Sequence, residues 1–234
     1  MLGIAVLLII SWLLLYLIQK VHLNSLGLLP DKKISIYCLT GFILAIVLSF
    51  FAQFAGSFIN DSRWILNDEV KLSTIGNAIW WDAKSVLTEE LLFRGAILYI
   101  LIARIGPGKS ILISAISFGI YHWFSYGLLG NVVPMVLIFV GSGLMGYAWA
   151  LAFSRTGSIL LPFVLHLGWN LVQNIIFSKG PLGKLVLLQS GGHNLSTMES
   201  LGNYFIGMIL IPALMIAWIH FCIKTETQIS GHHR

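Results

Sequence analysis

Charged side chains are scarce in this sequence, and their scarcity excludes an ordinary soluble domain. Asp, Glu, Lys and Arg make up 10% of the 234 residues, hydrophobic residues make up 57%, and the mean hydropathy is +0.88. A soluble domain usually has about 25% charged residues. The sequence therefore predicts an integral membrane protein. Its formal net charge of +5 does not indicate a nucleic-acid partner, because the basic residues stand singly between apolar runs.

Cysteine is also rare, and no internal repeat or low-complexity segment is evident. Cys38 and Cys222 both lie in apolar stretches and lack the spacing of a metal site. This excludes a disulfide framework and predicts two free thiols among apolar neighbours. The apolar run 2–18 has no basic residue before it and no small-residue cleavage pattern after it. We therefore expect a retained helix there and not a cleaved signal peptide.

Seven stretches are apolar and long enough to span a bilayer, which takes about 20 residues. They cover 2–18, 34–59, 78–103, 110–129, 132–153, 158–177 and 203–223. The aromatic-rich interval 60–80 could contain an eighth helix. Residues 185–188 could lie at the membrane interface or enter the membrane as a re-entrant segment. We expect an all-α, polytopic membrane bundle of seven or eight helices with an intramembrane active-site cavity. Residues 1–234 would form one membrane domain.

Three charges stand close together in the stretch Thr88-Glu89-Glu90-Leu91-Leu92-Phe93-Arg94. Each charge opposes insertion at the bilayer centre by about 2.5–3.5 kcal/mol, so they must be paired or face water. Residues four apart share a helix face, which predicts a Glu90–Arg94 pair and leaves Glu89 available as a general base. The alternative is that all three form a packing network between helices.

Two histidines lie deep in other apolar runs, each with a partner four residues away. Phe118 can shelter and orient His122, whereas His166 and Asn170 can both donate hydrogen bonds toward one point, as an oxyanion site requires. A single membrane histidine can equally serve as a structural hydrogen-bond partner between helices. In a further helix, Ser142, Gly146 and Ala150 recur at four-residue spacing, a pattern that predicts close helix packing.

Together these groups could build water-mediated peptide hydrolysis, with or without a metal. Glu89, His122 and His166 are the residues that could hold a zinc ion with an open position for water. The zinc-protease motif HExxH is absent, and the ligand spacing does not decide for or against a metal.

The ordered motifs Glu89-Glu90-xxx-Arg94, Phe118-xxx-His122 and His166-xxx-Asn170 resemble the CPBP family of intramembrane proteases. This is the CAAX-processing and bacteriocin-processing, or Abi, family, and it includes the Rce1-type endopeptidases. The resemblance covers about residues 80–177, the expected catalytic core. It implies that Glu89 and His122 activate water, that Glu90 is tied to Arg94, and that His166 and Asn170 stabilise the oxyanion. Members have been described both as metalloproteases and as glutamate proteases.

The resemblance implies an intramembrane endopeptidase that acts on membrane peptides or lipidated proteins within the bilayer. The short chain resembles bacterial members linked to bacteriocin self-immunity, so we expect a multi-pass protein of a prokaryotic plasma membrane. The alternative is a non-catalytic immunity or peptide-binding protein on the same fold. A proton-coupled transporter is a third reading, because intramembrane Glu and His also relay protons, but no inverted repeat supports it.

Overall fold

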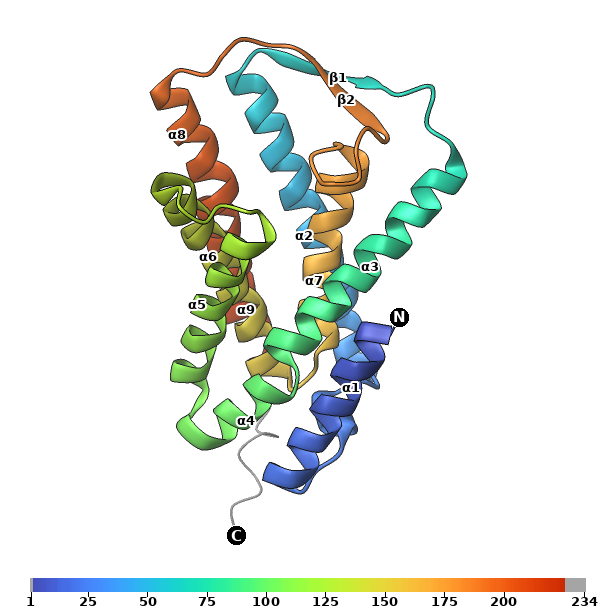
Figure 1. Cartoon of the computed structure of the whole chain (residues 1–234), viewed down its shortest axis with the longest axis vertical. Helices are drawn as coiled ribbons and strands as arrows, with labels where there is room; N and C mark the ends of the chain where they lie inside the picture. Colours follow the sequence, from blue (N-terminus) through green and yellow to red (C-terminus); the bar gives the residue numbers. More distant parts are fainter. Residues whose placement is uncertain (1, 226–234) are drawn as a thin grey trace.

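The computed structural model describes residues 2–225 and shows a bundle of helices with a small sheet across one end (Figure 1). The helices are α1 (Leu2–Leu14), α2 (Lys32–Ile59), α3 (Leu72–Arg94), α4 (Ala96–Ile105), α5 (Pro107–Ser125), α6 (Val132–Thr156), α7 (Leu160–Asn170), α8 (Thr197–Phe205) and α9 (Ile211–Cys222). Three π-helical segments, Leu15–Gln19, Leu171–Ile176 and Ile206–Leu210, continue α1, α7 and α8, and a short 3₁₀ helix covers Leu23–Leu26. The all-α membrane fold is thus confirmed.

The expected number of seven or eight spans is not established. Within the described residues, four helical runs are long and apolar enough to cross a membrane: Leu2–Gln19, Lys32–Ile59, Val132–Thr156 and Thr197–Cys222. The apolar run Leu160–Ile176 is shorter. The expected span 78–103 is broken at Gly95, where α3 ends and α4 begins. Gly95 is required there, because a Cβ would overlap the carbonyl of Leu91.

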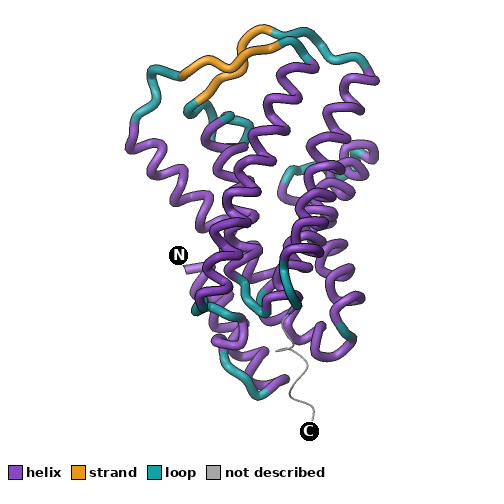
Figure 2. Tube along the Cα trace, turned by 180° about the vertical axis from the view of Figure 1, so that it is seen from behind, coloured by secondary structure: helices purple, strands orange, loops and turns teal. Residues whose placement is uncertain are grey.

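The interval 60–80, considered for an extra helix, contains strand β1 of a two-stranded antiparallel sheet and the first turns of α3. β1 (Ser62–Leu66) pairs with β2 (Leu187–Gly191), from Ser62 opposite Gly191 to Leu66 opposite Leu187. Residues 187 and 188 therefore belong to a strand. Figure 2 shows the sheet lying across the end of the bundle that is opposite the loop joining α1 to α2.

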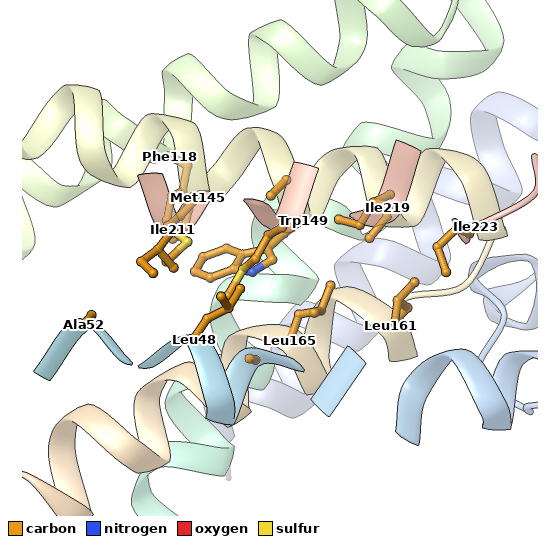
Figure 3. Packing of buried hydrophobic residues seen from close by; sticks show 14 residues of the cluster. Leu48, Ala52, Phe118, Met145, Trp149, Leu161, Leu165, Ile211, Ile219 and Ile223 are labelled. Carbon is orange, nitrogen blue, oxygen red and sulfur yellow. The ribbon is translucent and has the colours of Figure 1, made fainter. Parts of the chain in front are cut away.

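The main apolar core packs α6 against its neighbours. Trp149 of α6 lies among Phe118 of α5, Leu48 of α2 and Leu165 of α7 (Figure 3). Many other large apolar side chains on the helices are exposed, as expected where lipid is the solvent. The close packing around Trp149 holds α5, α6 and α7 together, and α5 and α7 carry three residues of the site described next.

Candidate active site

A cavity of about 1060 Å³ opens inside the bundle. Four of the six predicted catalytic residues lie on its wall: Glu89, His122, His166 and Asn170. They come from three helices, α3, α5 and α7. The two remaining residues, Glu90 and Arg94, are completely buried behind this wall.

The predicted pairing of Glu90 with Arg94 is present in the structure. Arg94 Nη1 donates to Glu90 Oε1 at 3.2 Å, and neither side chain is exposed. Arg94 Nη2 donates to the carbonyl oxygen of Gly146 on α6 at 3.1 Å. The guanidinium carbon also lies 4.3 Å from the ring centre of Phe118 and 5.2 Å from that of Trp149. Arg94 therefore joins α3 to α5 and α6 while neutralising one carboxylate.

Gly146 provides the space that this buried guanidinium needs. A Cβ at this position would lie 3.0 Å from Phe118 Cδ1 and 3.1 Å from Arg94 Nη2. The small residue predicted to permit close helix approach thus accommodates a side chain from α3 and one from α5.

His166 lies between the two adjacent carboxylates, a position that its sequence pattern did not indicate. Its Nδ1 is 2.8 Å from Glu90 Oε1 and its Nε2 is 3.9 Å from Glu89 Oε2. The imidazole stacks on Trp149, with ring centres 3.8 Å apart and planes inclined by 15°. Glu90 and Trp149 therefore hold the ring so that Nε2 lies on the side of Glu89.

Glu89 differs from Glu90 in its access to the cavity. Its side chain is 17% exposed, whereas that of Glu90 is 0% exposed. Adjacent residues on a helix diverge by about 100°, which separates the two carboxylates. Glu89 is therefore the carboxylate that a water molecule in the cavity can reach.

His122 is oriented by the residue one helical turn before it. Its Nδ1 lies 2.8 Å from the carbonyl oxygen of Phe118, and the two ring centres are 4.4 Å apart. A carbonyl oxygen only accepts, so Nδ1 carries the hydrogen and the neutral ring keeps a lone pair on Nε2. The sheltering role predicted for Phe118 is therefore accompanied by a backbone contact that selects the tautomer.

Asn170 ends α7, and the π-helical segment Leu171–Ile176 begins directly after it. Within this segment, Asn174 donates from Nδ2 to Oδ1 of Asp82 on α3 at 2.8 Å. We did not predict a role for either residue. Two signals were available: Asp82 is an ionisable residue in a membrane helix, and Asn174 continues the four-residue spacing of His166 and Asn170.

The cavity ends near the sheet at Lys179, in the loop that follows the π-helical segment. Lys179 Nζ donates to Gln189 Oε1 of β2 at 2.5 Å and lies 5.1 Å from the ring centre of Trp64 in β1. Partial burial lowers the pKa of the Lys179 ammonium. These contacts join the loop to both strands beside the cavity.

The zinc ligands considered from the sequence do not form a ready-made metal site. Among residues 2–225, no three His, Cys, Asp or Glu side chains are arranged so that they could hold an ion. Glu89, His122 and His166 face one cavity, but the observed arrangement does not fit them to a common metal.

The fold and the cavity define a multi-pass helical membrane protein with a buried Glu-Arg-His site. Residues 74–172 match the family model described as type II CAAX prenyl endopeptidase, Rce1-like. This segment contains all six predicted catalytic residues, and the match confirms the resemblance of residues 74–172 to the CAAX proteases. No curated protein and no solved structure gave a significant match to the chain.

Proposed function

We propose that this protein is an intramembrane endopeptidase that hydrolyses a peptide bond with water activated by Glu89 and His122. The observation that supports this most directly is the different environment of the two adjacent glutamates. Glu90 is bound by Arg94 and His166, whereas Glu89 faces the cavity that also contains His122. One carboxylate is thus structural and the other is free to take a proton.

The reaction needs a base, an oxyanion site and a proton donor for the leaving group. Glu89 takes a proton from water while Nε2 of His122 accepts a hydrogen bond from the same water. The oxygen attacks the peptide carbonyl carbon, and the proton on Glu89 then passes to the amide nitrogen as the C–N bond breaks. The products are a carboxylic acid and an amine, which together contain the atoms of the peptide and of one water molecule.

Asn170 and His166 would stabilise the oxyanion that forms during the attack, and both line the cavity. Asn170 can donate from its side-chain amide. Nδ1 of His166 contacts Glu90 Oε1 at 2.8 Å, and Nε2 can donate into the cavity when it carries a hydrogen. In this role Glu90 orients the imidazole, much as a carboxylate orients the histidine of other hydrolases.

The substrate we propose is a membrane peptide or a lipidated protein, reached within the bilayer. The family description suggests prenylated proteins with a carboxy-terminal CAAX sequence. The second substrate class is a bacteriocin-like peptide, as for the self-immunity type in a prokaryotic plasma membrane. Both substrate classes need the same site, with a hydrolytic water held deep inside an apolar bundle.

The test is cleavage by purified protein in detergent, with products identified by mass spectrometry. A farnesylated peptide ending in a CAAX sequence and the same peptide without lipid are suitable probes, each with and without a chelator. Cleavage by wild type and its loss in Glu89→Gln would support the proposal. Binding of the probes without hydrolysis would contradict it and favour the non-catalytic reading. Loss of activity with chelator, restored by zinc, would contradict the metal-free route.

A further inference from the structure

Asp82 is a buried carboxylate that the proposed reaction does not use. Its side chain is 0% exposed, and Oδ2 has no hydrogen-bond partner among the described residues. Oδ1 accepts the hydrogen bond from Asn174, 92 positions later in the chain. A buried carboxylate is costly in a membrane, and an apolar side chain would pack there at lower cost. The energetics therefore point to a role beyond packing.

In the described part of the chain, two side-chain hydrogen bonds join α3 to the α7 region, and this pair forms the second of them. The first contact joins Glu90 to His166 and the second joins Asp82 to Asn174. Asp82 and Glu90 are eight positions apart on α3, and their partners Asn174 and His166 are also eight positions apart. The later residue of α3 contacts the earlier residue of the α7 region, so the two segments run antiparallel. Eight residues of α-helix extend about 12 Å. Asn170 lies midway between the two anchored positions His166 and Asn174.

The anchored segment has an unusual backbone. Leu171–Ile176 is π-helical, and such turns are weaker than α-helix and occur often at functional sites. It is also held from α2, because Gln173 Nε2 donates to Ser49 Oγ at 2.8 Å. Gln53 Nε2 in turn donates to Gln173 Oε1 at 2.5 Å. The π-helical turn is therefore fixed by side chains on two sides, α3 and α2.

We propose that Asp82 is a positioning residue: through its hydrogen bond to Asn174, it fixes the π-helical turn and aims Asn170 at the reacting carbonyl beside Glu89. The inference rests on the proposed function for its catalytic consequence. The geometric part, the placement of Asn170, does not depend on catalysis. The two parts can therefore be tested separately.

The catalytic part is tested by the kinetics of four variants. Asp82→Ala and Asn174→Ala should each lower kcat by roughly 10–100-fold with KM within about twofold, because a small misplacement of an oxyanion donor has effects of this size. The double variant should be no slower than either single one, since both remove one interaction. Asp82→Asn keeps an oxygen that can accept from Asn174, and it should restore most of the turnover.

The matched control is Ser158→Ala. Ser158 is a buried residue whose Oγ donates to the carbonyl oxygen of Gly27, and it does not line the cavity. Its loss removes this hydrogen bond and the one that Ser158 Oγ accepts from Leu160 N, at the end of α7 remote from Asn170, so kcat should stay at the wild-type value. Equal loss of kcat in Ser158→Ala, or additive losses in the double variant, would overturn the positioning role.

The geometric part is tested without any substrate. Asn170→Cys is placed in a background where Cys38 and Cys222 are replaced by Ala, and its alkylation rate by a water-soluble maleimide is measured. Adding Asp82→Ala should change this rate several-fold, whereas adding Asp82→Asn or Ser158→Ala should not. An unchanged rate with Asp82→Ala would overturn the inference. If wild type cleaves no probe but the rate changes as expected, the proposed function fails and the placement of Asn170 stands.

Discussion

Glu90 and His166 lie 76 positions apart in the chain, yet Oε1 of Glu90 is 2.8 Å from Nδ1 of the imidazole. The same oxygen accepts from Arg94, so the buried carboxylate has two basic partners. Burial of an ionised carboxylate requires such compensation. The consequence for Glu89 is that Arg94 and Nδ1 of His166 are already engaged by Glu90, which leaves the Glu89 carboxylate open to the cavity.

Replacing Glu89 by Gln should abolish turnover. Gln keeps the shape of the side chain but cannot take a proton from water, and loss of a general base costs roughly 10²–10⁴-fold. Hydrolysis of a membrane-peptide probe in detergent is the measurement. Glu69→Gln is the control, because Glu69 is an exposed carboxylate in the turn before α3. Full turnover by Glu89→Gln would show that another group is the base.

Replacing Arg94 by Ala should unfold the protein at a much lower temperature. Removing one partner of a buried ion pair costs about 3–5 kcal/mol, because Glu90 would stay buried and keep only the contact with His166. Arg94→Lys should recover only part of this loss, since an ammonium lacks the planar fork that reaches both Glu90 and Gly146. Thermal unfolding in detergent measures the effect.

Arg104→Ala is the control for this prediction, because Arg104 is exposed on α4. Exposed substitutions usually change the free energy of unfolding by less than about 0.5 kcal/mol. An unfolding temperature for Arg94→Ala equal to that of Arg104→Ala would mean that the Glu90–Arg94 pair does not stabilise the bundle.

Gly146→Ala and Gly143→Ala should have opposite effects on stability although both lie in α6. Alanine stabilises a helix by roughly 0.5–1 kcal/mol relative to glycine. A Cβ at Gly143 meets only Ala115 O at 3.6 Å, an ordinary contact, so this gain should be visible. At Gly146 the Cβ would press on Phe118 and Arg94, and overpacking costs about 1–3 kcal/mol. Comparison of the two unfolding temperatures is the check, and a stabilised Gly146→Ala would show that the guanidinium has room to move.

Asn170→Ala should lower kcat by roughly 10²–10³-fold with little change in KM, because an oxyanion donor acts mainly in the transition state. Asn203→Ala is the control, because Asn203 of α8 also lines the cavity but belongs to a different wall. Steady-state kinetics of both variants decides. A raised KM with unchanged kcat would assign Asn170 to substrate binding instead.

Local spacing was enough to predict the parts of the site that lie on one helix. Glu90 and Arg94, like Phe118 and His122, are four residues apart, and helical geometry alone brings each pair together. The break at Gly95 and the pairing of β1 with β2 depend on contacts between distant segments, so hydropathy could not indicate them. The same holds for Asp82 and Asn174, whose contact exists only because α3 crosses the α7 region in reverse direction.

Gly180→Ala should reduce turnover although Gly180 donates no group to the reaction. A Cβ at this position would overlap the side-chain amide of Asn174, so the amide must move away from Asp82 or the loop must shift. Either displacement loosens the π-helical turn that carries Asn174, and kcat should fall while Asp82 and Asn174 are both still present.

Gly76→Ala is the control, since a Cβ at Gly76 of α3 meets no atom within 4 Å. In an Asn174→Ala background the two closest overlapping atoms, Oδ1 and Cγ, are gone, so Gly180→Ala should cost less kcat than it does in wild type. Equal losses in the two backgrounds would mean that Gly180 acts through the loop and not through Asn174.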